Sequence, residues 1–336
     1  MNRDAITLWE DGEYDYKQSC GFKPNMVPYL HGKRDGGRKR PCMIVVPGSG
    51  YCVVSPSEGG IIANTFFDKG YQTFVVTYSC NPLMIGALDD QPLKDLSRAV
   101  RMVRANADKY DVDPDRIYIV GFSAGAHLCA SICVHFMDAP DLNSKYSKVS
   151  NRPNAAILSY PVITSGEFAH QGSFQALLGR DIYDGDDAAK KEKLHYQSLE
   201  TQVTDQTPPC FMWHTATDGL VPCENSLLFA AALKAHGVKF GLHIFTEGNH
   251  GLSLANSNWA HGWFGENYCD EQKYCIKEAV LSGEISLPDK EREDFFASCE
   301  PISESDFLGM NIPNPEVSVW PDLADDFLST IEKRAI

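Results

Sequence analysis

Short apolar runs alternate with amphipathic helical segments from about residue 42 to residue 255. The apolar runs predict strands, and the segments between them, such as 92–110 and 225–236, have apolar residues at helical spacing. Alternation of this kind is typical of parallel βαβ units. We therefore predict an α/β protein with a mainly parallel central sheet and helices on both faces. The predicted strands are 42–46, 73–78, 116–120, 155–159, 210–215 and 240–245.

Three segments do not follow this alternation. Residues 1–41 precede it and are predicted to form an antiparallel edge of the sheet. Residues 165–207 have few strand signals and several turn residues, which indicates a lid or a side excursion. Residues 257–315 are irregular and are interpreted as an insertion, because a helical apolar pattern resumes at Trp320. We expect a single domain over 1–336 that carries both the excursion and the insertion.

The pattern G-x-S-x-G occurs at residues 121–125, between the predicted strand 116–120 and an apolar helical segment at 126–136. A strand that turns sharply into a helix at this pattern lifts the central serine, here Ser123, clear of the sheet. The two glycines keep side chains out of the place where strand and helix nearly collide. The five-residue pattern also occurs by chance, so its setting between strand and helix gives it weight.

A serine nucleophile needs a base, and the base needs an acid that orients it. In hydrolases with this strand–helix turn, the acid and then the histidine follow the serine along the chain. Asp218 follows the strand 210–215 and His250 follows the strand 240–245, so we expect both at one edge of the sheet. Alone, Asp218 would be a turn aspartate and His250 a loop histidine. Their order after Ser123 favours catalysis.

Four other histidines are weaker candidates for the base. His214 and His243 lie within predicted strands, and His261 lies in the predicted insertion. His127 is interpreted as a helix side chain near the floor of the pocket.

Stabilising a tetrahedral intermediate requires hydrogen-bond donors for its oxyanion. The backbone N–H of Ala124, directly after the serine, is expected to be one donor. The N–H groups of Ser49 and Gly50 are the other expected donors, because they lie in a Gly-rich loop after the strand 42–46. A plain Gly-rich turn is the alternative for this loop. A phosphate-binding loop is disfavoured, because neither of the usual glycine-rich phosphate motifs is present.

Composition narrows the choice of partner and compartment. A formal net charge of −15 disfavours nucleic acid and anionic membranes as partners. No apolar run approaches the roughly 20 residues that span a bilayer, and the first residues lack the apolar core of a secretory signal. The cysteines are interpreted as reduced thiols, so a cytoplasmic protein is expected. Those interpreted as small buried side chains are Cys42, Cys129, Cys133 and Cys210.

Neither a cofactor nor a metal is expected. Cys269 and Cys275, with His261 and Cys299 nearby, are residue types that bind zinc, but their spacing is not that of the usual zinc motifs.

Several segments around these candidate site residues match a known family of enzymes. They are 47–51, 55–59, 70–79, 112–127, 158–163, 207–226 and 248–254. Through them the chain resembles the α/β-hydrolase superfamily, and within it the bacterial acetyl-xylan and related carbohydrate esterases of the hormone-sensitive-lipase-like branch. The resemblance covers about residues 25–256 and resumes around 319–328. Two features depart from it: Ser49 stands where relatives usually carry glycine, and 257–315 is not part of the usual core.

The resemblance implies a serine esterase that hydrolyses small acyl esters, acetyl in particular, on oligosaccharides such as xylo-oligosaccharides. Ser123 would attack the ester carbonyl and His250, oriented by Asp218, would take its proton before water hydrolyses the acyl-enzyme. The base must be neutral, so activity is expected to fall as the pH drops through about 6–7. Tyr51 and Trp213 are candidates for stacking on a sugar ring, with core packing as the alternative for Trp213.

Other functions use the same residues. A peptidase, or a lactone or thioester hydrolase, is an alternative because one triad serves several acyl groups. A non-catalytic ligand-binding protein is a further alternative, disfavoured because all three triad residues are present. The expected partner is a small-molecule ester, with acetylated oligosaccharides preferred. The sugar and the oligomeric state stay open, and a homo-oligomer is among the alternatives.

Overall fold

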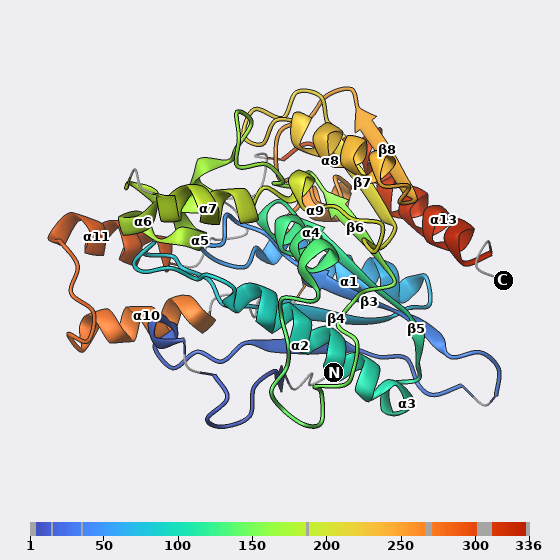
Figure 1. The fold of residues 1–336 in the computed structure, drawn as a ribbon, viewed down its shortest axis with the longest axis horizontal. Helices are drawn as coiled ribbons and strands as arrows, with labels where there is room; N and C mark the ends of the chain where they lie inside the picture. The colour runs from blue at the N-terminus through green and yellow to red at the C-terminus, as the bar shows by residue number, and fades with distance from the viewer. Residues whose placement is uncertain are drawn as a thin grey trace.

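The computed structural model describes residues 5–333 apart from 15, 35, 186–187, 266–270 and 301–310. Its centre is an eight-stranded sheet with the strand order β1-β2-β4-β3-β5-β6-β7-β8 (Figure 1). The strands are β1 (Ile6–Thr7), β2 (Asn25–Tyr29), β3 (Arg40–Val46), β4 (Gln72–Thr77), β5 (Val112–Phe122), β6 (Ala155–Ser159), β7 (Cys210–Thr215) and β8 (Phe240–Phe245).

The sheet is parallel from β4 to β8 and antiparallel at one edge. Strand β1 pairs antiparallel with β2, and β2 pairs antiparallel with β4. Every other neighbouring pair is parallel. The predicted antiparallel edge within 1–41 and the predicted mainly parallel sheet are both confirmed. The carboxyl ends of β5, β7 and β8 therefore meet at one edge.

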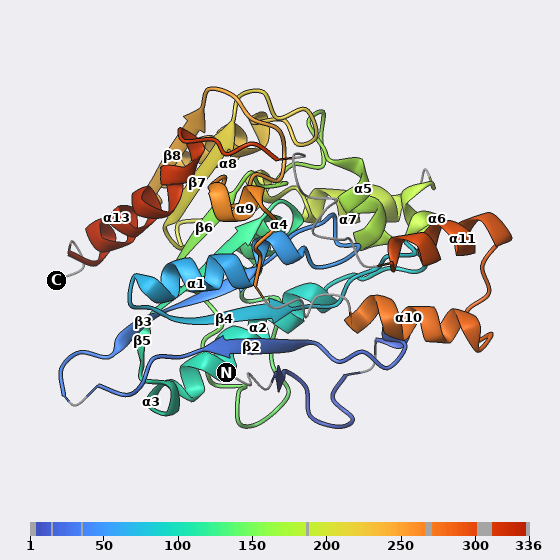
Figure 2. The same ribbon diagram turned by 180° about the vertical axis from the view of Figure 1, so that it is seen from behind.

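Helices cover both faces of the sheet, as predicted. Helices α2 (Gln91–Ala105), α4 (Ala124–His135) and α8 (Glu224–Ala235) pack on the face turned to the viewer in Figure 1. Helices α1 (Gly60–Asp68), α9 (Ser257–Ala260) and α13 (Trp320–Lys333) pack on the opposite face (Figure 2).

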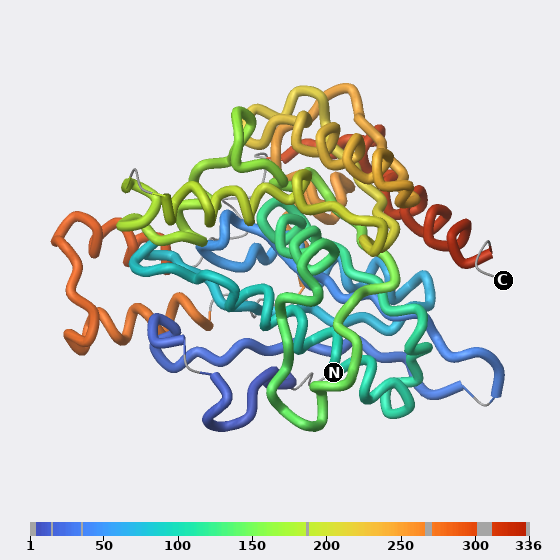
Figure 3. Tube along the Cα trace, viewed as in Figure 1, coloured from blue at the N-terminus to red at the C-terminus, as the bar shows by residue number. Residues whose placement is uncertain are grey.

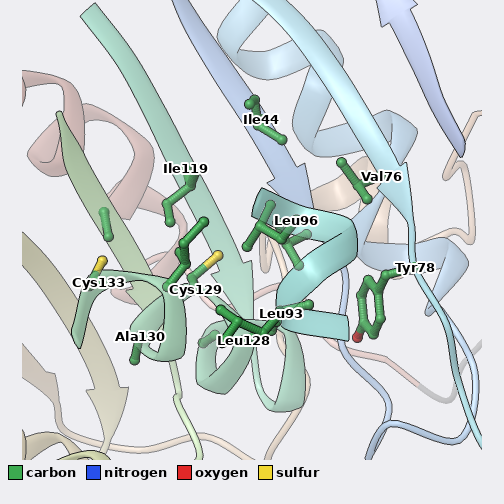
Figure 4. Packing of buried hydrophobic residues seen from close by; sticks show 14 of the residues in the cluster. Ile44, Val76, Tyr78, Leu93, Leu96, Ile119, Leu128, Cys129, Ala130 and Cys133 are labelled. Atoms are coloured by element: carbon green, nitrogen blue, oxygen red, sulfur yellow. The ribbon is translucent and has the colours of Figure 1, made fainter. Parts of the chain in front are cut away.

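Alternating residues of the strands feed these two cores. In β3, Ile44 packs into the core with α2 and α4, whereas Val45 packs into the core with α1 and α13, because successive side chains of a strand point to opposite faces. In Figure 4, Leu128 of α4 lies next to Leu93 of α2, and Leu96 of α2 lies between these two residues and Ile44 of β3. The four cysteines interpreted as buried, Cys42, Cys129, Cys133 and Cys210, are each 0% exposed.

The predicted helix 92–110 is two helices, which corrects that prediction. Helix α2 ends at Ala105 and the short α3 (Ala107–Tyr110) follows. The residue between them, Asn106, donates a hydrogen bond from its side chain to the carbonyl of Met102 at 2.8 Å. Asparagine competes for backbone groups in this way and so favours helix ends.

The segment 165–207 contains three short helices, α5 (Gln171–Leu178), α6 (Arg180–Tyr183) and α7 (Ala188–Tyr196). The segment 257–315 contains α9, α10 (Glu271–Leu281) and α11 (Asp289–Ser298). The tube view shows α10 and α11 (orange) reaching along one side of the molecule (Figure 3). Arg180 of α6 donates to Glu291 of α11 at 3.4 Å, which joins the two segments. We propose that both belong to one domain with the sheet.

Candidate active site

Ser123 lies at a sharp turn between β5 and α4, with φ 52° and ψ −118°. A non-glycine residue with positive φ is strained and is held only by its surroundings. A Cβ on Gly121 would lie 2.4 Å from the carbonyl oxygen of Gly125, and one on Gly125 would lie 2.2 Å from that of Val46. Both distances are shorter than any real contact of a Cβ. The turn therefore depends on glycine at both positions.

The structure brings Ser123, His250 and Asp218 together. Ser123 Oγ lies 2.8 Å from His250 Nε2, and His250 Nδ1 lies 2.7 Å from Asp218 Oδ2. A carboxylate only accepts hydrogen bonds, so Nδ1 carries the imidazole proton and Nε2 accepts the hydroxyl of Ser123. Nucleophile and base are thus within hydrogen-bond reach of each other, with the base oriented by an acid.

Asp218 is held by more than its histidine partner. Its Oδ1 accepts the backbone N–H groups of Leu220 and Val221, both at 2.9 Å. Its Oδ2 also lies 3.3 Å from Nε2 of His214. Burial raises the pKa of Asp218, but the hydrogen bonds from His214 and His250 outweigh burial, so the pKa is below its usual value. The carboxylate is therefore ionised at neutral pH.

The contact of His214 with the catalytic aspartate candidate was not predicted from the sequence. His214 is fully buried, with Nδ1 2.9 Å from the hydroxyl of Ser226 and Nε2 2.9 Å from the carbonyl of Val221. It does not contact Ser123 as a base would, but it fixes the turn that carries Asp218. The spacing of four residues between His214 and Asp218 could have indicated this contact.

The loop after β3 turns through three successive residues with positive φ. These are Ser49 at 105°, Gly50 at 65° and Tyr51 at 61°. Within the described residues, the backbone N–H groups of Ser49, Gly50 and Ala124 donate to no acceptor. Unpaired backbone N–H groups of this kind are what an oxyanion requires.

The interpretation of Tyr51 as a residue that stacks on substrate is wrong. Its side chain is 1% exposed, and its hydroxyl lies 2.8 Å from Nδ1 of His127. The positive-φ turn directs the ring into the core, where it packs edge-on against Tyr78. Trp213 is also buried, stacked on Trp320 at 5.5 Å between ring centroids. Core packing was the correct alternative for Trp213.

His127 is a buried helix side chain, in line with its interpretation. Its Nε2 lies 3.0 Å from the carbonyl oxygen of Gln197 in the excursion, and its Nδ1 accepts the hydroxyl of Tyr51. Burial lowers the pKa of His127 to about 4, although the contact with Gln197 opposes this. The ring is therefore neutral and joins α4, the loop 47–51 after β3 and the segment 165–207.

His170 is a second residue that sequence reasoning missed. It caps α5, where its Nδ1 accepts the N–H of Ser173 at 3.3 Å, so the ring proton is on Nε2. Within the described residues Nε2 has no partner. A Cβ on Gly50 would lie 4.0 Å from the His170 ring. Burial and then the charge of His250 lower the pKa of His170, so a neutral imidazole faces the loop 47–51.

The remaining histidine candidates pack against aromatic rings. His243 packs against Phe211 at 5.2 Å and His261 against Trp263 at 5.1 Å between ring centroids. Among the described residues, no group of three or more His, Cys, Asp or Glu side chains could hold a metal ion. Cys269 lies outside the described residues. No helix in the described part of the chain is long and apolar enough to span a membrane.

Comparison with known proteins finds relatives among enzymes. The model of the BD-FAE family matches residues 29–233. The chain is 45% identical over 280 residues to endo-1,4-beta-xylanase B of Butyrivibrio fibrisolvens, which covers 83% of this chain and 42% of that protein. It is 31% identical over 237 residues to the acetylxylan esterase of Xylanibacter ruminicola, which covers 69% of this chain and 44% of that protein. The chain thus spans less than half the length of these two curated relatives.

A solved structure is also similar. It is the acetyl ester-xyloside bifunctional hydrolase from Caldicellulosiruptor lactoaceticus, with a TM-score of 0.67 and 38% sequence identity. The match covers 84% of this chain and 97% of that chain.

Proposed function

The chain belongs to the BD-FAE family and has the α/β-hydrolase fold, and from this premise we propose that it is a carboxylic ester hydrolase with Ser123, His250 and Asp218 as its triad. One observation carries the proposal. The ends of β5, β7 and β8 bring the three side chains into contacts of 2.8 Å and 2.7 Å. Their order along the chain is that of serine hydrolases with this fold.

Acylation would follow from these contacts. Ser123 Oγ attacks the ester carbonyl carbon while His250 Nε2 takes the hydroxyl proton. Asp218 keeps the ring in its tautomer and stabilises the positive charge that forms on it. The carbonyl oxygen becomes an oxyanion and accepts the N–H groups of Ser49, Gly50 and Ala124.

Collapse of the intermediate and deacylation use the same groups. The imidazolium of His250 gives its proton to the alcohol oxygen as the bond from acyl carbon to that oxygen breaks. A water molecule then attacks the acyl-enzyme, and His250 takes its proton. The carboxylic acid leaves, and the proton returns to Ser123.

The substrate that we propose is an acetyl ester on a xylo-oligosaccharide. Support comes from a relative named acetylxylan esterase and from a similar structure described as an acetyl ester-xyloside bifunctional hydrolase. The Nε2–H of His170 is available to donate to a hydroxyl of the sugar alcohol. A xylanase activity is not proposed, because this chain covers 42% of the relative with that name.

We propose that the protein works in the cytoplasm. The ten cysteines in the described part of the chain are free thiols, which fits a reducing compartment. The substrate there would be an imported oligosaccharide rather than the intact polymer.

Acetate release tests the proposal. Wild type, Ser123→Ala and Ser131→Ala are assayed with an aryl acetate and with an acetylated xylo-oligosaccharide. We expect wild type to act on both and Ser123→Ala to lose about a thousandfold or more in kcat. Ser131, on the same helix, donates to the carbonyl of His127 at 2.8 Å, so its variant is a matched control that keeps activity.

Two results would contradict the proposal. Full activity of Ser123→Ala would exclude the triad. Turnover of the aryl ester alone would exclude the carbohydrate substrate and favour a lactone, thioester or peptide.

A further inference from the structure

A second carboxyl group lies buried behind the active site. Glu58 ends the short 3-10 helix η2 (Pro56–Glu58) and is 4% exposed. Its Oε2 accepts the backbone N–H of Gly48 at 2.7 Å, and its Oε1 accepts the hydroxyl of Tyr160 at 2.7 Å. Gly48 opens the loop that carries Ser49 and Gly50. Glu58 therefore holds the oxyanion loop directly.

The same carboxyl is connected to the loop of His250. The ring of Tyr160 lies edge-on to His250, with 4.9 Å between ring centroids. The hydroxyl oxygen of Tyr160 accepts the N–H of Ser253 at 3.0 Å, three residues after the histidine. Ser253 in turn donates from Oγ to the carbonyl of Ser57 at 2.6 Å. Glu58 is thus linked to the loop of Ser49 and Gly50 directly, and to the loop of His250 through Tyr160.

The hydrogen bonds indicate the charge of Glu58. The backbone N–H groups of Gly48 and Ser253 can only donate. The hydroxyl of Tyr160 has one proton, and the acceptor that lies within reach of this proton is Glu58. With Glu58 ionised, every one of these donors has an acceptor. With Glu58 protonated, either its own proton or that of Tyr160 would be left unpaired in a buried site, which is costly. The network is therefore complete only around a carboxylate.

We propose that Glu58 is a positioning residue that acts on both halves of the catalytic machinery. It fixes the oxyanion loop through Gly48, and it places a second negative charge, besides that of Asp218, near the imidazolium that forms on His250. The proposal rests on the proposed function, since His250 is the base only if Ser123 is the nucleophile.

Other titratable groups face this part of the site. Asp218 contacts His250 from the β7–α8 loop, His170 faces it from the excursion, and the phenols of Tyr160 and Tyr78 lie near Glu58. Burial raises the pKa of Glu58, while Tyr160, Gly48 and the charge of His250 oppose that change. Burial also raises the pKa of both tyrosines well above the ordinary value, so neither ionises in the range tested.

Replacing Glu58 by Gln tests the charge at nearly constant volume. Without the anion the imidazolium is less stable, so we expect kcat to fall about tenfold with KM changed less than about twofold. The acid limb of kcat/KM should move to lower pH by about half a unit or more. A role in packing alone would lower stability and leave the acid limb where it is in wild type.

A matched control is Asp95→Asn. Asp95 is a second fully buried carboxyl, held by Trp9, Ser79 and Gln91 through side-chain and backbone donors. It contacts none of the triad residues in the described part of the chain, so its replacement should lower stability and leave the acid limb unmoved. If Glu58→Gln does not fold, Tyr160→Phe removes the hydroxyl that donates to Glu58 and accepts from Ser253, and it keeps the ring against His250. A wild-type kcat and acid limb in that variant would overturn the part of the proposal that connects Glu58 to His250 through Tyr160.

Covalent labelling separates this proposal from the proposed function. Ser123 Oγ displaces fluoride from a fluorophosphonate while His250 takes its proton, and intact mass measures the rate without any ester. We expect the acid limb of labelling to move to lower pH in Glu58→Gln and to stay in place in Asp95→Asn. If the acid limb of the labelling rate in Glu58→Gln lies at the same pH as in wild type, the proposed role of Glu58 is overturned. Labelling of Ser123 without acetate release from any ester overturns the proposed substrate alone.

Discussion

Three histidines near Ser123 differ in role because their ring nitrogens have different partners. His250 is 13% exposed in its side chain and reaches Ser123 and Asp218. His214 and His127 are fully buried, and each has both nitrogens occupied by protein groups. A ring with two internal partners cannot exchange protons with substrate. His250, whose Nε2 contacts the hydroxyl of Ser123, is therefore suited to be the base.

The buried neutral ring of His127 makes stability depend on pH. Its pKa of about 4 in the folded protein is below the ordinary value of about 6.5. The unfolded chain therefore takes up the proton first. The stabilisation is complete above pH 6.5 and is lost as the pH falls towards 4, by up to about 3 kcal/mol.

Urea unfolding at pH 7, 5.5 and 4.5 checks this prediction. His127→Asn should be less stable than wild type at pH 7 and should lose less stability on acidification. His195→Asn, which changes an exposed histidine of the excursion, should keep the wild-type slope. Equal slopes for wild type and His127→Asn would contradict the assignment.

At the scale of elements, the turn between β5 and α4 is the most constrained part of the site. Strand β5 runs to Phe122 and α4 begins at Ala124, so one residue makes the change of direction. Helix α4 then starts directly above the end of β3. A Cβ on Gly125 would meet the carbonyl oxygens of Val46 at 2.2 Å and Pro47 at 2.5 Å, both of which are rigid backbone.

Gly125→Ala should therefore force α4 away from β3. We expect a loss of about 3 kcal/mol or more in the free energy of unfolding, together with slower labelling of Ser123 by a fluorophosphonate. Gly32→Ala is the control, because a Cβ at that position meets nothing within 4 Å. Urea unfolding of the two variants measures the difference. A Gly125→Ala protein as stable as the Gly32→Ala protein would refute this view of the turn.

The bounds of the last three strands were predicted correctly. The strands 155–159, 210–215 and 240–245 have the predicted bounds in the structure, since mainly apolar runs between turn residues define them. The helix expected at 92–110 is interrupted at Asn106. The apolar pattern continues past this residue, but the side chain of Asn106 bonds to the carbonyl of Met102 and so favours a helix end. Tyr51 was misplaced because an aromatic residue next to a loop gives no sign of which way its ring turns.

At the scale of the whole molecule, the site is built from segments that are far apart in the sequence. Ser123 and His250 are 127 positions apart, yet their partnership could be predicted, because the fold orders its strands and each side chain follows a strand end. Glu58, His170 and His214 could not be predicted in this way. Each acts through contacts that depend on tertiary packing, and none stands in a motif that the chemistry requires.

The excursion contributes to this assembly from outside the sheet. Its residue Gln197 accepts from His127, and its residue His170 faces Gly50. The contact between Arg180 and Glu291 continues the chain of interactions to α11. The surroundings of His127 and Gly50 therefore depend on a segment that lies outside the sheet.

Detection of the acyl-enzyme tests directly whether Ser123 is the nucleophile. Wild type is mixed with an aryl acetate, quenched within one turnover, digested and analysed by mass spectrometry. We expect one acetyl group on the peptide that contains Ser123, absent from the Ser123→Ala protein. Turnover with no acetyl group on Ser123, or with the acetyl group on another residue, would contradict this role of Ser123.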